Sequence, residues 1–318
     1  MADKIDRNLS HSTVHVTLST AAKPMRYLYY PGCSLEGTAV EYDLATRALM
    51  QALDIDVIDV AGWTCCGATA ASGVSRLLAL SLAARNLALA EAMHSDCDLL
   101  VPCSACYLNL QRAAHAMREE PQTRAAVNRI LADEHLSVTG TVRVRHILDV
   151  LARDVGADTI ASHVRRPLNG QTIAPYYGCQ CLRPYAVFDD PQAPASMSPL
   201  IRAVGAEVLP WTMGPRCCGG AHMTTHMHAG MDLTGAILAA AKDADAIATV
   251  CPMCQINLDG FQKKIARHRG AVLETTVVYL PQLLGLAMGL GPHAVGLQRN
   301  LSVTASFKNA LRSLEASV

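Results

Sequence analysis

The twelve cysteines of this 318-residue chain constrain its fold more than any other feature, because ten of them form two similar sets. In the first half, a single Cys is followed by 31 residues, an adjacent Cys pair, 36 residues and a Cys-x-x-Cys motif. The second half repeats this order with intervals of 37 and 32 residues, and corresponding cysteines lie 146 to 152 residues apart. The spacing predicts an internal duplication of about 150 residues rather than a solenoid of short repeats.

The residues around the cysteines repeat as well. The matching segments are YYPGC (29–33) and YYGC (176–179), WTCCGA (63–68) and WTMGPRCCGG (211–220), and VPCSAC (101–106) and VCPMC (250–254). Trp63 and Trp211, the two tryptophans of the chain, occupy the same place in each copy. We expect both indoles to pack against the cysteine loops, because a large ring contributes most when buried.

Short apolar runs lead into the cysteine motifs, and helix-like stretches separate them. The predicted strands are 26–31, 55–60, 98–102, 172–177, 206–210 and 246–250, and the predicted helices are 38–53, 73–94, 107–119, 196–204, 222–242 and 254–268. A further strand and helix at 142–154 is echoed by 275–289. This alternation predicts an α/β fold of two tandem domains, each a small parallel sheet with flanking helices. The cysteines then meet at the carboxyl ends of the strands, where open α/β sheets bind ligands.

These patterns also predict the domain boundaries. We expect an N-terminal extension at 1–24, a first domain at 25–156, a linker at 157–171, a second domain at 172–296 and a peripheral C-terminal tail at 297–318.

Charge and hydropathy limit the partners and the compartment. The 27 Lys and Arg balance the 27 Asp and Glu, so the net charge favours neither nucleic acid nor an anionic membrane. The first 24 residues lack the apolar core of a secretion signal, and no apolar run reaches the ~18 residues of a membrane span. We therefore expect a cytoplasmic protein without a membrane span. In that reducing compartment, so many cysteines indicate metal or redox chemistry rather than disulfides.

Thiolates are soft ligands that select iron–sulfur clusters, zinc or copper(I). A structural zinc ion takes four ligands, whereas each half offers five cysteines that recur in both copies. The spacing favours a multi-iron cluster in each half, with a zinc-stapled scaffold and redox-active dithiols as open alternatives.

The repeated arrangement resembles the paired CCG domains in the B-type subunit of heterodisulfide reductase. The segment YYPGCSLEGTAVEYD (29–43) is similar to the first motif of that family, and the resemblance covers about residues 25–295. It implies two noncubane 4Fe–4S clusters with five cysteine ligands each. The implied ligands are Cys33, Cys65, Cys66, Cys103 and Cys106 for one cluster, and Cys179, Cys217, Cys218, Cys251 and Cys254 for the other. Cys97 and Cys181 are then spare, although Cys181 could replace Cys179.

The resemblance further implies an oxidoreductase subunit that carries out disulfide and thiol redox chemistry. It implies a ferredoxin-like partner of the C type and a flavin-containing partner of the A type. One version of the family reduces the mixed disulfide of coenzymes M and B in methanogens. The other acts in bacterial sulfur oxidation, where a lipoate-binding protein presents the sulfur. Only six of the 27 basic residues are Lys, which resembles the composition of a high-GC bacterium, so we expect the sulfur-oxidising version.

A different enzyme class remains as the alternative. Electron-transfer subunits of glycolate, lactate and glycerol-3-phosphate dehydrogenases also carry paired CCG domains. They usually have an added region with CxxCxxC runs, and this sequence has none.

Two other residues are candidates for the chemistry. His222, four residues before His226, could donate a proton to a leaving thiolate, or the pair could simply lie on a solvated helix face. Arg216, next to the second Cys pair, could meet an anionic substrate or stabilise a negative cluster. No phosphate-binding glycine loop or Ser-His-Asp order is present, so phosphoryl transfer and hydrolysis have no support.

Overall fold

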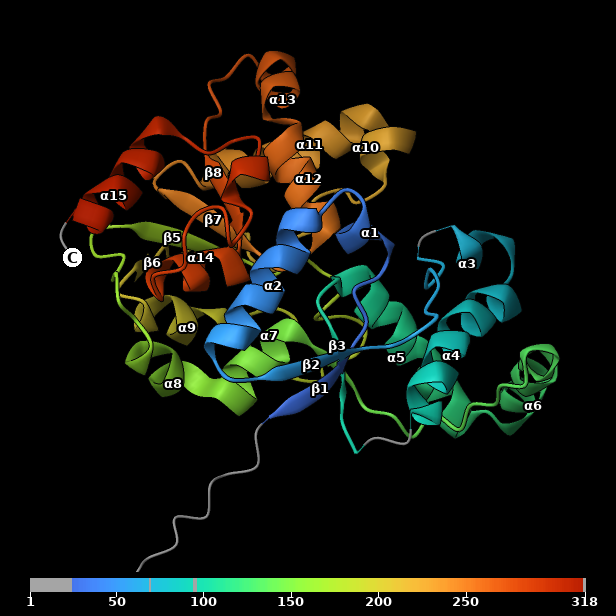
Figure 1. Cartoon of the computed structure of the whole chain (residues 1–318). Coiled ribbons are helices and arrows are strands. Elements are labelled where there is room, and N and C mark those ends of the chain that lie inside the picture. The colour runs from blue at the N-terminus through green and yellow to red at the C-terminus, as the bar shows by residue number, and fades with distance from the viewer. Residues whose placement is uncertain (1–24, 69, 94–95, 317–318) are drawn as a thin grey trace, which may run out of the picture.

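The computed structural model describes residues 25–68, 70–93 and 96–316. The extension predicted at 1–24 and the last two residues of the predicted tail lie outside this part of the chain. Within it, two four-stranded sheets form the two halves of the molecule (Figure 1). The first sheet consists of β1 (Arg26–Tyr29), β2 (Asp56–Asp59), β3 (Leu99–Val101) and β4 (Val144–His146). The second consists of β5 (Thr172–Tyr176), β6 (Glu207–Val208), β7 (Ala246–Thr249) and β8 (Thr276–Tyr279).

The two sheets have the same topology. Their strand orders are β2–β1–β3–β4 and β6–β5–β7–β8, and every pair of neighbours is parallel. The predicted α/β class and the duplication are therefore confirmed. Strands β3, β4, β7 and β8 are buried along their whole length, as expected where helices cover both faces of a parallel sheet.

Helices connect the strands. Those of the first half are α1 (Cys33–Glu36), α2 (Val40–Ala52), α3 (Ala71–Val74), α4 (Arg76–Ala92), α5 (Ser104–Glu119), α6 (Pro121–Leu131), α7 (Ile147–Asp149) and α8 (Gly156–Ser162), with a 3-10 turn at Ala132–Glu134 and a π-helix at Val150–Val155. Those of the second half are α9 (Met197–Ala203), α10 (His222–Thr225), α11 (Met227–Ala240), α12 (Pro252–Gly260), α13 (Gln262–Arg269), α14 (Leu280–Ala287) and α15 (Ala305–Ala316), with a 3-10 turn at Leu297–Arg299.

Local sequence explains where several helices begin and end. The Ser75 hydroxyl accepts a hydrogen bond from the Leu78 amide at 3.4 Å and caps α4. Pro121 begins α6, where its missing N–H costs nothing. Gly270 ends α13 at φ 61°, a conformation that glycine adopts without strain.

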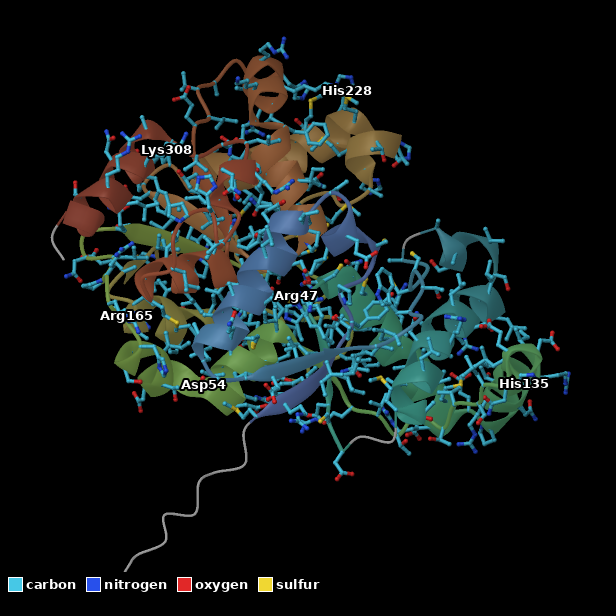
Figure 2. The ribbon with its side chains drawn as sticks, in the orientation of Figure 1. Arg47, Asp54, His135, Arg165, His228 and Lys308 are labelled. Atoms are coloured by element: carbon cyan, nitrogen blue, oxygen red, sulfur yellow. The ribbon has the colours of Figure 1, made fainter. Side chains whose placement is uncertain are left out.

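The two halves interlock through reciprocal helix contacts. Helix α2 of the first half packs against α14 of the second, and α9 of the second half packs against α8 of the first. Figure 1 shows α2 at the junction of the halves, beside α14. Arg47 of α2, labelled in Figure 2, lies 4.4 Å over the Tyr29 ring and pairs with Asp59, which fixes α2 to its own sheet. A large hydrophobic cluster contains residues of both halves, and a smaller one lies within the second half, so the two halves pack together through the larger cluster.

The segments predicted as a linker and a tail contain regular structure and side-chain contacts. Helix α8 occupies part of 157–171. In the C-terminal segment, Phe307 is 1% exposed, and the Asn300 amide donates a hydrogen bond to the Val277 carbonyl at 2.8 Å. The Asp259 carboxylate accepts bonds from the amides of Leu301 and Ser302 at 2.8 and 2.6 Å. Side-chain hydrogen bonds therefore hold the segment from 297 onward against the second half. Such bonds leave no periodic pattern in the sequence.

Candidate metal centres

The parallel sheets carry the cysteines to one edge of each half. Cys33 and Cys179 follow β1 and β5 by a few residues, and the adjacent pairs follow β2 and β6. Cys103 and Cys251 follow β3 and β7 and stand at the N-caps of α5 and α12. The same topology thus positions five thiols at the carboxyl edge of each sheet, as the sequence predicted.

The first sulfur centre contains the thiols of Cys33, Cys65, Cys66, Cys103 and Cys106. Cys33 Sγ lies 3.8 Å from Cys65 Sγ, and Cys66 Sγ lies 3.3 Å from Cys106 Sγ. The Cys103 thiol hydrogen-bonds to Cys106 and completes the group.

The second sulfur centre contains the thiols of Cys179, Cys217, Cys218, Cys251 and Cys254. Cys218 Sγ lies 3.6 Å from Cys254 Sγ, and Cys179 hydrogen-bonds to Cys217. All five residues line a cavity of ≈ 110 Å³. No disulfide joins any of the twelve cysteines, all of which the structure describes.

Each centre has an open and a closed side, and the two halves match in this respect. Cys65 and Cys217, which come first in the adjacent pairs, are exposed. The second members, Cys66 and Cys218, are buried, as are all four cysteines of the Cys-x-x-Cys motifs. Solvent therefore reaches the same part of each centre.

Glycines make room for the thiols at equivalent places. Gly32 and Gly178 adopt φ of +73° and +70°, and a Cβ added to either would lie 2.9 Å from the sulfur of Cys106 or Cys254. A side chain at either position would displace a thiol and strain the backbone, so glycine is required at both.

The thiols of each centre share their protons. A hydrogen bond from Cys179, aided by the nearby charges of His222 and Arg183, lowers the pKa of Cys217 to about 6. A hydrogen bond from Cys254 lowers the pKa of Cys251 to about 7, whereas the pKa of Cys254 itself is raised. In the first centre, a hydrogen bond from Cys106 lowers the pKa of Cys66. Some thiols thus ionise only because their neighbours keep a proton.

This donor set fits an iron–sulfur cluster. Five adjacent thiolates repel one another unless a cation neutralises them, and a bound metal deprotonates its thiols outright. Within the described residues, no three His, Cys, Asp or Glu side chains converge on one point as the ligands of a single ion do. A cluster does not need such convergence, since its iron atoms take separate ligands.

Two asparagines that the sequence reasoning missed support the buried cysteines. Asn109 Nδ2 donates to the Cys66 carbonyl at 3.2 Å, and Asn257 Nδ2 donates to the Cys218 carbonyl at 3.3 Å and to its sulfur at 3.5 Å. Each asparagine stands three residues after the last cysteine of its half. The duplicated pattern C-x-x-C-x-x-N was therefore the signal that could have found them.

A tyrosine in each half also fixes the loop of the adjacent cysteines. The Tyr30 hydroxyl donates to the Thr64 carbonyl and the Tyr176 hydroxyl to the Arg216 carbonyl, both at 2.7 Å and both just before the Cys pair. The Trp63 ring meets Tyr30 edge-on at 5.4 Å, and Trp211 meets Tyr176 at 6.2 Å, so the predicted packing of both indoles is confirmed. Tyr30 thus corresponds to Tyr176, and the two motifs align without a gap.

The remaining predicted residues are placed as follows. Cys181 is buried and donates to the Tyr177 carbonyl at 3.2 Å, whereas Cys179 contacts the second centre. Cys97 precedes β3, at the opposite end of that strand from Cys103. His222 is exposed at the start of α10, near Cys217, and its ring lies 5.5 Å from that of His226.

Arginines gather near the loop that precedes Cys217. Arg216 is exposed beside Cys217 and lines a pocket of ≈ 520 Å³ with Arg183 and Arg202. Arg183, which the sequence reasoning did not single out, donates to the Pro215 carbonyl at 2.6 Å. Its position leaves no sign in the sequence, because the irregular segment after Cys181 brings it back to the loop before Cys217.

No helix in the described part of the chain combines the length and the apolar character needed to cross a membrane.

The chain is similar to known proteins that carry the cysteine-rich domain. The family model of the CCG cysteine-rich domain matches residues 27–111 and 173–259. The membrane anchor subunit of 8-methylmenaquinol:fumarate reductase from Wolinella succinogenes is 35% identical over 282 residues, which cover 86% of this chain and 96% of that protein. A protein from Archaeoglobus profundus, named for its likeness to the B-type subunit of heterodisulfide reductase, is 31% identical over 280 residues, 85% of this chain and 93% of its own.

Two further relatives extend the comparison. The B-type subunit of the ferredoxin/F(420)H(2)-dependent CoB-CoM heterodisulfide reductase from Methanosarcina acetivorans is 28% identical over 294 residues, 90% of this chain and 97% of its own. The crystal structure of a hypothetical protein from Helicobacter pylori aligns with a TM-score of 0.73 at 14% identity, covering 90% of this chain and 53% of that one. This last likeness is one of fold alone.

The fold and the two sulfur centres define a protein with paired cysteine-rich CCG domains. The chain belongs to this family, and within it to the proteins that resemble the B-type subunit of heterodisulfide reductase. It is therefore an iron–sulfur redox subunit of the heterodisulfide reductase type, whose relatives work as parts of larger complexes.

Proposed function

We propose that each sulfur centre holds one noncubane 4Fe–4S cluster through all five of its cysteines. The contacts between the thiols, the proton sharing and the glycines that make room at Cys106 and Cys254 support this assignment. Cys97 and Cys181 stay outside the ligand sets, because Cys97 lies at the far end of β3 and Cys181 turns to the Tyr177 carbonyl.

We further propose that the protein is the catalytic subunit for disulfide and thiol redox chemistry. Reduction consumes one disulfide, two electrons and two protons and releases two thiols, and oxidation is the reverse. The clusters, when bound, supply one-electron transfer and a soft metal surface for sulfur. The chain admits the substrate at the exposed cysteines Cys65 and Cys217, and His222 beside Cys217 provides a proton. Arg183, whose charge acts on Cys217, and Arg216, next to Cys217 in the chain, provide positive charge.

The duplication of the centre is the observation that carries this proposal. A disulfide has two sulfurs that leave as two thiolates, and the chain offers two sites with the same open side. The relatives named as B-type subunits of CoB-CoM heterodisulfide reductases support the same reaction class.

As the substrate we propose sulfur bound to the lipoyl group of a lipoate-binding protein, in cytoplasmic sulfur oxidation. The Lys-poor, Arg-rich composition supports this version over the methanogenic one. Electrons would leave through a ferredoxin-like subunit of the C type to a flavin-containing subunit of the A type.

A second function is electron transfer between a quinol and a separate catalytic subunit. The relative from Wolinella succinogenes, at 35% identity, is named as part of an 8-methylmenaquinol:fumarate reductase and favours this candidate. In that case the centres relay electrons and bind no sulfur substrate.

Iron and acid-labile sulfide in anaerobically purified protein test the cluster assignment. We expect iron and sulfide for two clusters in the wild type, about half in Cys66→Ala and in Cys218→Ala, and the full amount in Cys97→Ala. One metal ion per half without sulfide would refute the assignment. Reduction of the holoprotein by dihydrolipoyl protein, compared with reduction by a menaquinol analogue, separates the two functions.

A further inference from the structure

Ser104 connects the two sulfur centres across the interface of the halves. It stands between Cys103 and Cys106 in the first centre, begins helix α5 and is 1% exposed. Its hydroxyl donates a hydrogen bond of 2.9 Å to the carbonyl of Val250, the residue just before Cys251. Cys103 and Cys251 are thereby linked through covalent bonds and one hydrogen bond.

The Ser104 side chain also lines the cavity of the second centre. Among the described residues around that cavity, it alone comes from the first half. Its hydroxyl lies near the thiols of Cys251 and Cys181. A residue of the first motif is thus part of the wall of the second centre.

His146 orients this hydroxyl. The His146 Nδ1 accepts a hydrogen bond from the Leu148 amide at 3.2 Å, so in the neutral ring Nε2 carries the proton. Nε2 then donates to Ser104 Oγ at 3.2 Å, which leaves the single serine proton for the Val250 carbonyl. Complete burial lowers the pKa of His146 to about 3, so the ring is neutral at ordinary pH. A parallel stack on Phe188 at 5.9 Å holds the ring in place.

The residue of the second half that corresponds to Ser104 makes no equivalent hydrogen bond to the first half. Pro252 takes the place of Ser104 in the second motif, and Tyr279 takes the place of His146 at the end of the fourth strand. Proline has no side-chain donor. The Pro102 carbonyl, which corresponds to that of Val250, instead accepts from the Tyr42 hydroxyl of its own half at 3.1 Å. The cross-domain contact therefore distinguishes two centres that are otherwise alike.

We propose that Ser104, oriented by His146, is a positioning residue that the first half supplies to the second centre and that raises the reduction potential of that centre alone. The inference rests on the proposed clusters. The Ser104 donor is bonded to the peptide carbonyl directly before the ligand Cys251, so its positive hydrogen lies beside the second centre and favours the more negative, reduced state. Outer contacts of this kind tune reduction potentials. Two centres made by duplication thereby acquire different potentials.

Single-centre backgrounds test this role. Cys66→Ala retains only the second cluster and Cys218→Ala only the first, so redox titration by electron paramagnetic resonance reports each centre separately. We expect Ser104→Ala to shift the midpoint potential of the second centre to more negative values and to leave the first unchanged. His146→Phe, which keeps a ring against Phe188 but lacks Nε2, should shift it in the same direction.

Two further variants separate loss of the Ser104 hydrogen bond from a general disturbance of the start of helix α5. Ser104→Pro copies Pro252 at the first helical position, where proline is tolerated, and should reproduce the shift. Ala105→Gly alters the first turn of the same helix without removing the hydrogen bond to Val250 and should leave the second centre unchanged.

Three results would overturn the proposal. Equal shifts of both centres would mean that Ser104 acts on its own loop. A lower melting temperature with unchanged potentials would make it a packing residue only. Absence of iron and sulfide from both backgrounds and from the wild type would overturn the proposed clusters, and the role of Ser104 with them.

Discussion

The rings of Tyr42 and Tyr279 stack across the interface with centroids 4.0 Å apart and planes 4° apart. Phe188 and His146 form the reciprocal stack, with planes again 4° apart. Tyr42 and Phe188 each follow the first cysteine of their half by nine residues, and Tyr279 and His146 each end a fourth strand. The duplicated halves thus exchange an aromatic contact, which places the buried sides of the two centres next to the same interface.

Removal of the Tyr42 ring should destabilise the whole protein. Tyr42→Ala empties a fully buried site and should lower the free energy of unfolding by about 3–5 kcal/mol. Tyr42→Phe keeps the stack but leaves the Pro102 carbonyl without its partner, at a cost of about 1–3 kcal/mol. Gln51→Ala, at an exposed site on the same helix, should stay within about 0.5 kcal/mol. Urea unfolding measures all three, and equal costs for Tyr42→Ala and Gln51→Ala would contradict the role of the stack.

A buried ion network should stabilise the first half. Arg145 is 3% exposed and pairs with Asp98 and Asp154 at 3.0 Å and with Asp149, whose side chain is fully buried. Arg145→Met leaves the buried Asp149 carboxylate with only the 3.6 Å pair to the exposed Arg153 and should cost about 3–5 kcal/mol of unfolding free energy. The double variant Arg145→Met/Asp149→Leu removes the stranded charge and should recover part of that loss in urea unfolding. A double variant less stable than Arg145→Met would exclude this explanation.

The same network predicts a response to acid. Burial alone would raise the pKa of Asp154, but hydrogen bonds from Arg145 and Tyr27 outweigh it and lower the pKa below 3.8. Because the folded pKa lies below the unfolded one, the stabilisation is complete above about pH 4. It is lost as the pH falls through the folded value. Asp154→Asn should therefore be less stable than the wild type at pH 7, and the difference should shrink towards pH 3. A difference that persists unchanged at pH 3 would contradict the linkage.

Much of the fold could be predicted because the sequence repeats its own pattern. The predicted strand 246–250 and helix 38–53 coincide with β7 and α2. The strand is a short apolar run that is buried throughout, and the helix has buried residues at helical spacing. Helix α6 was missed because its short amphipathic run follows directly on α5, with only Glu120 between them. The interface was not predictable, because a stack such as Tyr42 on Tyr279 joins residues 237 positions apart without a local signal.

The candidate site, like the fold, could be predicted only in part. The sulfur sets follow from spacing, and their gathering at the strand ends follows from the parallel topology. Asn257 and Ser104 escaped notice because neither residue type indicates metal binding by itself. Their roles come from where their side chains reach, Asn257 to the Cys218 loop and Ser104 into the other half.

Thiol reactivity in the iron-free chain should follow the unequal pKa values. Cys33 and Cys217 are both exposed. Partial burial and the neighbouring Cys65 raise the pKa of Cys33 to about 11, whereas the hydrogen bond from Cys179 lowers that of Cys217 to about 6. Since the thiolate is the nucleophile, iodoacetamide at pH 7 should modify Cys217 at least roughly tenfold faster than Cys33.

Peptide mapping by mass spectrometry, on protein whose fold circular dichroism verifies, checks this order. The rate at Cys217 should rise between about pH 5 and 7 and then level off, because its thiol ionises in that interval. Cys179→Ala removes the hydrogen bond and should move the rise to higher pH. Equal rates at Cys33 and Cys217 would show that the thiols do not share protons as described.

Because Asn257 supports the loop of Cys218, its substitution should weaken iron binding in the second centre selectively. Asn257 Nδ2 donates to the carbonyl and the sulfur of Cys218 and also to the Gly220 carbonyl at 3.1 Å. Asn257→Leu keeps the volume but removes these bonds and should weaken iron binding in the second centre by roughly 10- to 100-fold, as loss of such outer contacts does at other metal sites. Asn257→Asp replaces the donor with a negative charge and should weaken it more.

The duplication supplies the matched control, because Asn109→Leu should affect the first centre in the same way and spare the second. Competition with an iron chelator in the Cys66→Ala and Cys218→Ala backgrounds separates the centres. Asn257→Leu should release iron faster only where the second centre remains. Equal release from both backgrounds would mean that Asn257 stabilises the fold as a whole, because a contact confined to the Cys218 loop cannot weaken a cluster held by the other half.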